Sequence, residues 1–215
     1  MAEMNLKLIK KGAEAELYRG QWLGYDAIFK RRVRKEYRNA DLDAYIRGSR
    51  TSLEAKLLAQ ARKLGVPTPV VLFVDLRNYE IIMNHIPGIS VKKLIDTLDV
   101  PSVKSLFSTI GEMVGRLHLG GLVHGDLTTS NILVFNNSVF FIDFGLGEYT
   151  SELEARGVDI HLMRRALESS HHAVSKVAYT SFIDGYKGIM KEMGKEILIR
   201  VDEIRRRGRY VEGER

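Results

Sequence analysis

The sequence predicts an α+β fold in which strands dominate the N-terminal part and helices dominate the C-terminal part. Short apolar runs bounded by turn residues recur over the first 84 residues, and one amphipathic helix interrupts them at residues 51–64. After residue 100, apolar residues recur at the three- and four-residue spacing of helices. These patterns divide the chain into an N-terminal lobe at residues 1–84 and a helical C-terminal lobe at residues 85–215.

The composition is that of an ordinary globular protein and excludes several other classes. Of 215 residues, 45% are hydrophobic and 28% are charged. The chain contains no cysteine, which excludes disulfides and thiolate metal sites. No apolar run reaches the roughly 18–20 residues that a membrane helix needs, and the N-terminus lacks a signal-peptide pattern. We therefore expect a cytoplasmic protein that does not contact membranes.

Basic residues exceed acidic ones and give a net charge of +6. The excess is concentrated at Lys30–Arg38 and Arg200–Arg215. Such clusters are typical of proteins that meet a polyanion such as RNA, but a solvated basic face explains them equally well. Charge alone leaves both interpretations open.

Two hairpins are expected at the start of the chain. Residues 6–19 predict two short strands around a turn, and residues 22–31 predict a second hairpin with Gly24 near its turn. Lys30 follows directly on the apolar run of this second hairpin. Residues 34–49 are polar and have no clear period, so we expect an exposed, mobile loop there.

The segment Thr51–Leu64 has the apolar spacing of an amphipathic helix that ends at Gly65. Glu54 lies on its apolar face, where a carboxylate needs a partner. It can pair with Lys30, or it can bond the Thr51 N–H as part of an N-terminal capping box. The resemblance described below favours the ion pair.

A polar stretch at residues 124–145 carries the side chains best suited to chemistry. Asp126 and Asn131 lie in a short loop, and a hairpin expected at residues 132–142 leads from them to Asp143. Once folded, this hairpin would bring Asn131 and Asp143 to the same end, close to Asp126. Carboxylate and amide oxygens suit Mg²⁺, which also takes phosphates and water as ligands. We therefore predict a metal site at Asn131 and Asp143, with Asp126 free to receive a proton.

The spacing of this stretch resembles the catalytic and metal-binding motifs of the protein-kinase-like fold, H-x-D-x-x-x-x-N followed by D-F-G. The resemblance implies a minimal bilobal kinase-like fold that uses ATP with Mg²⁺ or Mn²⁺. It implies Asp126 as catalytic base, with Asn131 and Asp143 holding the metal. Lys30 would grip the α- and β-phosphates, braced by Glu54.

The same resemblance places the nucleotide against the first hairpin, the strand that carries Lys30, and a hinge at residues 80–86 whose backbone would meet the adenine. Of the three glycines in the usual phosphate-covering loop, only Gly12 is present in this chain. Lys10 or Lys11 would supply positive charge where the missing glycines supply backbone N–H groups. His85 is interpreted as a loop residue, and His124 as an architectural one. The predicted nucleotide contacts are Ile9, Lys10, Lys11, Gly12, Ala13, Leu17, Ile28, Lys30, Glu54, Met83, Asn84, Ile86 and Asp143.

Further helices are expected in the C-terminal lobe. Gly157 should precede one of them, with Asp159 in its first turn. The Asp159 carboxylate either favours the helix N-terminus or, as in larger kinases, holds the backbone of the loop around Asp126. The adjacent His171 and His172 point in different directions on a helix, so we predict no metal there. We expect helices at residues 102–120, 158–168, 179–193 and 197–204, and a flexible basic tail at residues 205–215.

Two departures from larger kinases affect the expected activity. Gly125 stands where many kinases carry an arginine that reads a phosphorylated activation loop. No A-P-E motif follows Asp143, and we expect the C-terminal lobe to lack the region that binds peptide substrates in those enzymes. We expect ATP binding, but not efficient phosphorylation of protein substrates in trans.

This shortened outline, with HGDLTTSN, IDFGLG, VDIHLMRRAL and a basic tail, resembles the small atypical kinases of the archaeal and eukaryotic KEOPS complex, which are relatives of the RIO kinases. The resemblance implies an autophosphorylating serine/threonine kinase that also hydrolyses ATP. It implies a partner subunit of sugar-kinase-like fold that makes N6-threonylcarbamoyladenosine at adenosine 37 of tRNA, and a second small regulatory subunit. The tRNA would be reached through the complex, with residues 205–209 contacting the partner or the tRNA.

Two other functions stay open on sequence grounds. The motif H-G-D-L-x-x-x-N also occurs in sugar and aminoglycoside phosphotransferases, although those usually carry a larger helical lobe for the acceptor. Alternatively, ATP could only shape a binding surface without turnover, which the complete set of charged residues argues against.

Overall fold

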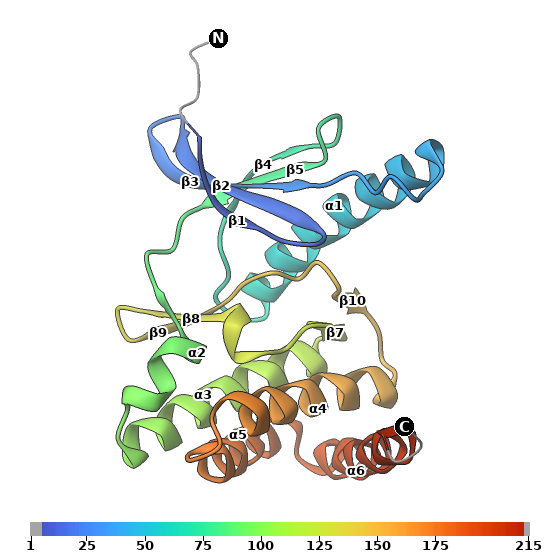
Figure 1. Ribbon diagram of the computed structural model, residues 1–215. Coiled ribbons are helices and arrows are strands. Elements are labelled where there is room, and N and C mark those ends of the chain that lie inside the picture. The colour runs from blue at the N-terminus through green and yellow to red at the C-terminus, as the bar shows by residue number, and fades with distance from the viewer. Residues whose placement is uncertain (1–5, 213–215) are drawn as a thin grey trace.

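A five-stranded antiparallel sheet with one long helix beside it forms the N-terminal half of the molecule (Figure 1). The computed structural model describes residues 6–212, and the side chains of residues 6–207. The strand order is β1-β2-β3-β5-β4. The bounds are Lys7–Lys11 for β1, Ala15–Trp22 for β2, Tyr25–Arg32 for β3, Val71–Asp75 for β4 and Glu80–Asn84 for β5, and the helix α1 spans Ala40–Lys63.

Strand β3 lies in the middle of this sheet and has two different faces. Ala27 and Phe29 are fully buried on one face, in a small apolar cluster with Ile82 of β5. Because side chains alternate along a strand, Lys30 and Arg32 share the opposite face, and both are buried. The sheet therefore presents two cations to the interior of the molecule.

Helix α1 begins well before the position that the apolar pattern indicated. Residues 34–49 were expected to form an exposed loop, and this prediction is wrong because the helix starts at Ala40. The Asn39 side chain accepts the Asp41 N–H at 2.9 Å, as an N-cap residue does. Asp43 is fully buried and is held by Arg47 at 2.6 Å. An ion pair rather than an apolar residue thus fills the buried face of the first turns.

The expected helix start at Thr51 is wrong, and with it the alternative of a capping box there, because Thr51 lies in the middle of α1. Its hydroxyl donates to the Arg47 carbonyl at 2.7 Å. The Glu54 carboxylate, one turn further on, is therefore free to reach across to the sheet.

Four long helices dominate the C-terminal half, below the sheet in Figure 1. Three short strands, β6, β8 and β9, form one small sheet, and β7 pairs with β10. The long helices are α3 (Val100–Leu119), α4 (Leu153–Ser170), α5 (Ser175–Met190) and α6 (Glu192–Glu212). The shorter elements are β6 (Ile89–Ser90), α2 (Val91–Leu94), η1 (Ile95–Thr97), β7 (Leu122–Val123), η2 (Thr129–Asn131), β8 (Ile132–Phe135), β9 (Ser138–Phe141) and β10 (Glu148–Tyr149).

Helices α3 and α5 pack with their backbones almost in contact. A Cβ on Gly111 would lie 2.0 Å from the Phe182 carbonyl oxygen, and a Cβ on Gly185 would lie 2.0 Å from the Ser108 carbonyl oxygen. Both glycines are therefore required by the packing of this helix pair.

Helix α4 begins at Leu153, so the expectation that Gly157 precedes it is wrong. Gly157 lies inside the helix, where a Cβ would come within 2.9 Å of Ile204 on α6. It is a packing residue rather than a helix breaker. Met193 belongs to α6 rather than to α5, because Lys191 adopts a positive φ of 52° between the two helices.

The basic tail was expected to be flexible from residue 205, but α6 continues as a helix to Glu212. Arg200 and Arg207 both pair with Glu154 of α4, and these ion pairs hold α6 against α4. Residues 213–215 lie outside the described part of the chain.

No helix in the described range, residues 6–212, combines the length and the apolar character needed to cross a membrane. The chain passes from the sheet to the helices through residues 85–88 (Figure 1). A boundary between residues 84 and 85 stays a prediction.

Candidate functional site

A cavity of about 570 Å³ opens between the five-stranded sheet and the C-terminal half. Strands β1, β2, β3 and β5 line one side of it, and β6, α2, η2 and β8 line the other. It gathers most of the nucleotide contacts predicted from sequence. Those that line it are Ile9, Lys10, Leu17, Ile28, Lys30, Glu54, Met83, Asn84, Ile86 and Asp143, and Asn131 lines it too.

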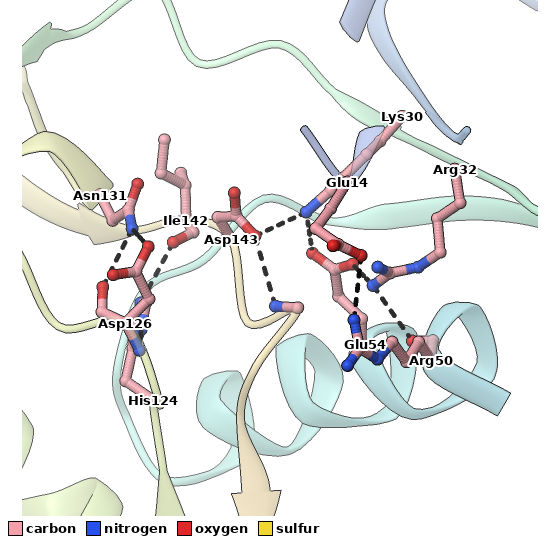
Figure 2. A network of polar contacts seen from close by, with 11 residues as sticks. Glu14, Lys30, Arg32, Arg50, Glu54, His124, Asp126, Asn131, Ile142 and Asp143 are labelled. Carbon is pink, nitrogen blue, oxygen red and sulfur yellow. Dashed lines mark hydrogen bonds and ion pairs between the residues drawn. The ribbon is translucent and has the colours of Figure 1, made fainter. Parts of the chain in front are cut away.

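Lys30 stands at the centre of the polar end of this cavity (Figure 2). Its Nζ lies 2.5 Å from Glu54 Oε1 and 2.6 Å from Asp143 Oδ1, which confirms the predicted Lys30–Glu54 ion pair. Burial disfavours the ammonium form, but the two carboxylates outweigh this and raise the pKa of Lys30. Lys30 is therefore a buried positive charge that lines the cavity.

Asp143 reaches this position because the β8–β9 hairpin folds back as expected. The Ile142 N–H donates to the Asn131 carbonyl at 3.0 Å, which brings the two ends of the hairpin together. Asp143 itself has a φ of 65°, a left-handed conformation found more often at functional sites than elsewhere. Burial opposes its ionisation, but Lys30 outweighs this and lowers the pKa of Asp143. Asp143 is therefore a carboxylate at neutral pH.

Asp126 and Asn131 are joined by a pair of hydrogen bonds. The Asn131 Nδ2 donates to Asp126 Oδ2 at 2.8 Å and to the Asp126 carbonyl at 2.9 Å. The amide oxygen of Asn131 therefore faces away from Asp126 (Figure 2). This oxygen and the Asp143 carboxylate form the kind of donor set that fits Mg²⁺ together with phosphate oxygens.

The backbone of the loop around Asp126 is held by Asp159 of α4. The Asp159 carboxylate accepts the His124 N–H at 2.6 Å and the Gly125 N–H at 2.8 Å. Since α4 starts at Leu153, Asp159 lies beyond its first turn. Of the two roles considered from sequence, the structure supports the one in which Asp159 positions this loop.

His124 packs this loop against the segment that follows the hairpin. Its ring lies 4.5 Å from the Phe144 ring, and its Nε2 lies 3.1 Å from the Ile142 carbonyl. Burial lowers the pKa of His124 below its ordinary value of 6.5, although three nearby aspartates act to raise it. The imidazole is therefore neutral and architectural, as expected.

The buried His124 makes the stability of the chain depend on pH. Below about pH 6.5 the unfolded chain takes up a proton on His124 that the folded chain does not, so the free energy of unfolding falls. We expect His124→Gln to reduce this fall, measured by urea unfolding without Mg²⁺ between about pH 8 and about pH 5. The control is His172→Gln, because His172 is exposed. Equal slopes for the two variants would contradict the prediction.

A second cavity of about 220 Å³ lies next to the first, on the side of Asp126. Two further predicted contacts, Gly12 and Ala13, line this cavity rather than the larger one. Lys11 is not among the residues that line either cavity. Its Nζ lies 3.2 Å from Glu16 Oε1, and 73% of its side chain is exposed.

One backbone N–H group of the hinge donates a hydrogen bond to β3, which the sequence could not show. The His85 N–H donates to the Asp26 carbonyl at 2.9 Å, and its Nδ1 lies 2.9 Å from Asp26 Oδ2. The backbone N–H of His85 is therefore already used. Ile86 and Asn84 line the cavity on either side of it.

Sequence reasoning missed several residues of the site. Arg32 is buried beside Lys30, and the signal for it is the two-residue alternation of a strand. Further residues that line the larger cavity were not predicted. They are Pro69, His85, Gly88, Ile89, Ser90, Lys93, Ser130, Leu133 and Ile142.

Comparison with known proteins identifies the family. Residues 14–158 match the RIO domain family, a span that includes Lys30, Glu54, Asp126, Asn131 and Asp143. The chain belongs to the RIO-domain family. It is 41% identical over 214 residues to the KEOPS complex subunit Bud32 of Pyrococcus abyssi, a match that covers 96% of this chain and 97% of the relative. This confirms the resemblance to KEOPS kinases inferred from the sequence motifs.

Longer relatives carry the same unit within a larger protein. The chain is 40% identical over 210 residues to a probable bifunctional tRNA threonylcarbamoyladenosine biosynthesis protein of Methanothermobacter thermautotrophicus. That match covers 98% of this chain but only 38% of the relative. The chain thus spans somewhat over a third of that protein's length.

Among solved structures, this RIO-domain chain resembles the Rio2 kinase of Chaetomium thermophilum, crystallised as an ADP/Mg²⁺-phosphoaspartate complex. The TM-score is 0.61 at 19% identity, and the match covers 94% of this chain and 70% of the other. At this identity the likeness shows the fold. The predicted α+β kinase-like fold, with a sheet-rich N-terminal part and a helical C-terminal part, is confirmed.

Proposed function

We propose that this RIO-domain chain binds ATP with Mg²⁺ and transfers the terminal phosphoryl group to a hydroxyl or to water. The observation that carries the proposal is the position of Lys30, within 2.6 Å of both Glu54 and Asp143 at the polar end of a cavity of about 570 Å³. Phosphoryl transfer asks a protein mainly for position and charge neutralisation, and this arrangement supplies both. The Rio2 complex with ADP and Mg²⁺ supports the choice of ligand.

Each polar residue has a distinct role in this proposal. Lys30 would grip the phosphates, and Asn131 and Asp143 would hold the metal, which neutralises phosphate charge when bound. Mn²⁺ could take the place of Mg²⁺. Asp126, fixed by Asn131 at 2.8 Å, would orient the acceptor and take its proton.

The adenine end would be less polar. Ile9, Leu17, Ile28 and Met83 line that part of the cavity, and the hinge backbone at Asn84 and Ile86 would read the base edge. Lys10, which lines both cavities, would supply charge near the phosphates where other kinases use glycine backbone. Lys11 lies outside both cavities, so its contribution would be a longer-range one.

The acceptor would be water or a serine or threonine of this chain. The second cavity, of about 220 Å³, borders Asp126 and is covered by Gly12 and Ala13. This volume admits a water molecule or a single side chain. Only the short strand β10 lies between Asp143 and α4, which leaves little chain to hold a peptide substrate. The activity we propose is therefore ATP hydrolysis with autophosphorylation, rather than efficient phosphorylation of other proteins.

The biological setting we propose is tRNA modification in the cytoplasm. The Pyrococcus relative is a KEOPS complex subunit, and the bifunctional relatives join a unit like this one to a threonylcarbamoyladenosine biosynthesis protein. Fusion keeps two activities at high effective concentration, which indicates that they work together. The partner would be the subunit of sugar-kinase-like fold, with a second small regulatory subunit and tRNA in the same complex.

The test measures Mg²⁺-dependent ATP hydrolysis by the chain alone, with the partner subunit, and with partner and tRNA. We expect slow turnover alone and faster turnover in the complex. Turnover that is indifferent to partner and tRNA would contradict the role in tRNA modification. Turnover that a sugar or an aminoglycoside stimulates would instead identify a small-molecule kinase, and binding without turnover would identify a scaffold. The same assay on a chain truncated before Gly208 tests whether the end of α6 contacts the partner or the tRNA.

A further inference from the structure

One carboxylate of α1 holds two buried cations of β3 (Figure 2). Lys30 and Arg32 are only 7% and 5% exposed. Lys30 Nζ lies 2.5 Å from Glu54 Oε1, and Arg32 Nη2 lies 2.6 Å from Glu54 Oε2. Each oxygen of Glu54 therefore has a cation of its own.

The Arg32 side chain also reaches beyond Glu54. Its Nη2 lies 3.4 Å from the Arg50 carbonyl, one turn earlier in α1. A Cβ placed on Gly145 would lie 3.3 Å from Arg32 Nη2, so the guanidinium lies against the segment that follows Asp143. Strand β3, helix α1 and the Asp143–Gly145 segment therefore meet at Arg32.

Filling this space does not by itself require an arginine. Arg32 Nε is buried without a hydrogen-bond partner among the described residues. An apolar side chain of similar size would avoid this cost, and replacing buried ion pairs by apolar residues is often neutral for stability. The charge of Arg32 therefore calls for an explanation beyond packing.

The charges at the site provide this explanation. Lys30 faces two carboxylates, Glu54 and Asp143, and in the proposed function it must also hold phosphates. Without another cation, a move of Lys30 toward phosphate would leave Glu54 buried and unpaired, which is strongly unfavourable. Arg32 keeps Glu54 paired whether Lys30 contacts Glu54 or the phosphates.

We propose that Arg32 is a positioning residue for phosphoryl transfer, which holds the second oxygen of Glu54 and thereby leaves the charge of Lys30 available to the phosphates of the nucleotide. This inference rests on the proposed function of the site.

The test compares Arg32→Met, Arg32→Lys and the control Arg31→Gln. Arg31 precedes Arg32 on β3 but pairs with Glu80, and 45% of its side chain is exposed. We expect Arg32→Met to lower kcat for ATP between about tenfold and about a hundredfold, as misplacement of a reacting group does. Arg32→Lys should restore most of this loss, and Arg31→Gln should leave turnover unchanged.

A binding measurement separates the proposed role from a general loss of structure. Calorimetry with Mg²⁺-ATP and with adenosine reports the phosphate grip and the adenine site separately. Arg32→Met should weaken ATP binding severalfold and leave adenosine binding unchanged. Equal losses for both ligands would overturn the proposal in favour of a structural role.

If Arg32→Met alone does not fold, the same substitution is made in a chain that also carries Glu54→Gln. This double variant has no carboxylate at position 54, so Arg32→Met leaves no buried unpaired charge. Because Arg32 acts through Glu54, the double variant should match Glu54→Gln within about twofold in kcat. Additive losses, or a single Arg32→Met variant as active as Arg31→Gln, would overturn the inference. A wild-type chain with no Mg²⁺-dependent turnover would instead contradict the proposed function, and ATP and adenosine binding would still decide the role of Arg32.

Discussion

Replacing Asp143 by asparagine should lower Mg²⁺-dependent ATP turnover by about a hundred- to a thousandfold, the range found when one charge-stabilising group is removed from a reaction site. Asp143 is the carboxylate of the predicted metal site, and Asn131 alone would hold Mg²⁺ weakly. Asparagine keeps the shape of the side chain, so the loss would come from charge. Steady-state turnover measured over a range of Mg²⁺ concentrations should show a much higher Mg²⁺ requirement for the variant.

Asp126→Asn is the informative comparison, because this residue would act on the acceptor rather than on the metal. We expect a similar fall in kcat with an unchanged Mg²⁺ requirement.

Without metal, Asp143→Asn should bind ATP at least as well as the wild type, since a carboxylate that faces the phosphates is gone. Asp202→Asn on the exposed face of α6 serves as the control. If Asp143→Asn and Asp126→Asn changed the Mg²⁺ requirement equally, the separate roles proposed for them would be wrong.

Local spacing explains why the centre of this site could be predicted from sequence. Asn131 and Asp143 flank a hairpin whose apolar runs and Asn-Asn turn are plain in the sequence, and pairing of those runs brings the two residues together. Local spacing could not predict the Lys30–Glu54 pair, because its partners are 24 residues apart. The resemblance to kinases supplied that contact, and the geometry confirmed it.

The errors share a physical cause. Apolar periodicity reports burial only where apolar residues fill the interior, and the first turns of α1 are buried through Asp43 and Arg47 instead. Arg32 was overlooked for the same reason, since it stands in a run of basic residues of which Arg31 and Arg34 are exposed. Gly157 was expected to precede a helix, although it lies inside α4 and packs closely against Ile204. Contacts between distant segments determine whether such residues are buried, and a single sequence does not reveal these contacts.

Gly125 should tolerate no side chain, and Gly125→Ala is expected to destabilise the fold by about 2–5 kcal/mol, the sum of a left-handed backbone cost and local overpacking. Gly125 has a φ of 79°, and a Cβ there would lie 2.0 Å from the Leu146 carbonyl oxygen. Backbone cannot move aside as a flexible side chain does. The substitution would therefore displace the segment that follows Asp143, and turnover should fall as well as stability.

Gly121→Ala is the matched control, because Gly121 has a similar φ of 71° but its nearest neighbour to a Cβ is 3.8 Å away. It should cost only the left-handed conformation, about 1–2 kcal/mol by urea unfolding, and leave turnover intact. If the two variants lost the same stability, the contact with Leu146 would not constrain this loop. A larger loss for Gly125→Ala would show that the Leu146 backbone leaves no space for a side chain at the position where many kinases carry an arginine. Regulation through an arginine at this position would then be excluded by the packing of the loop.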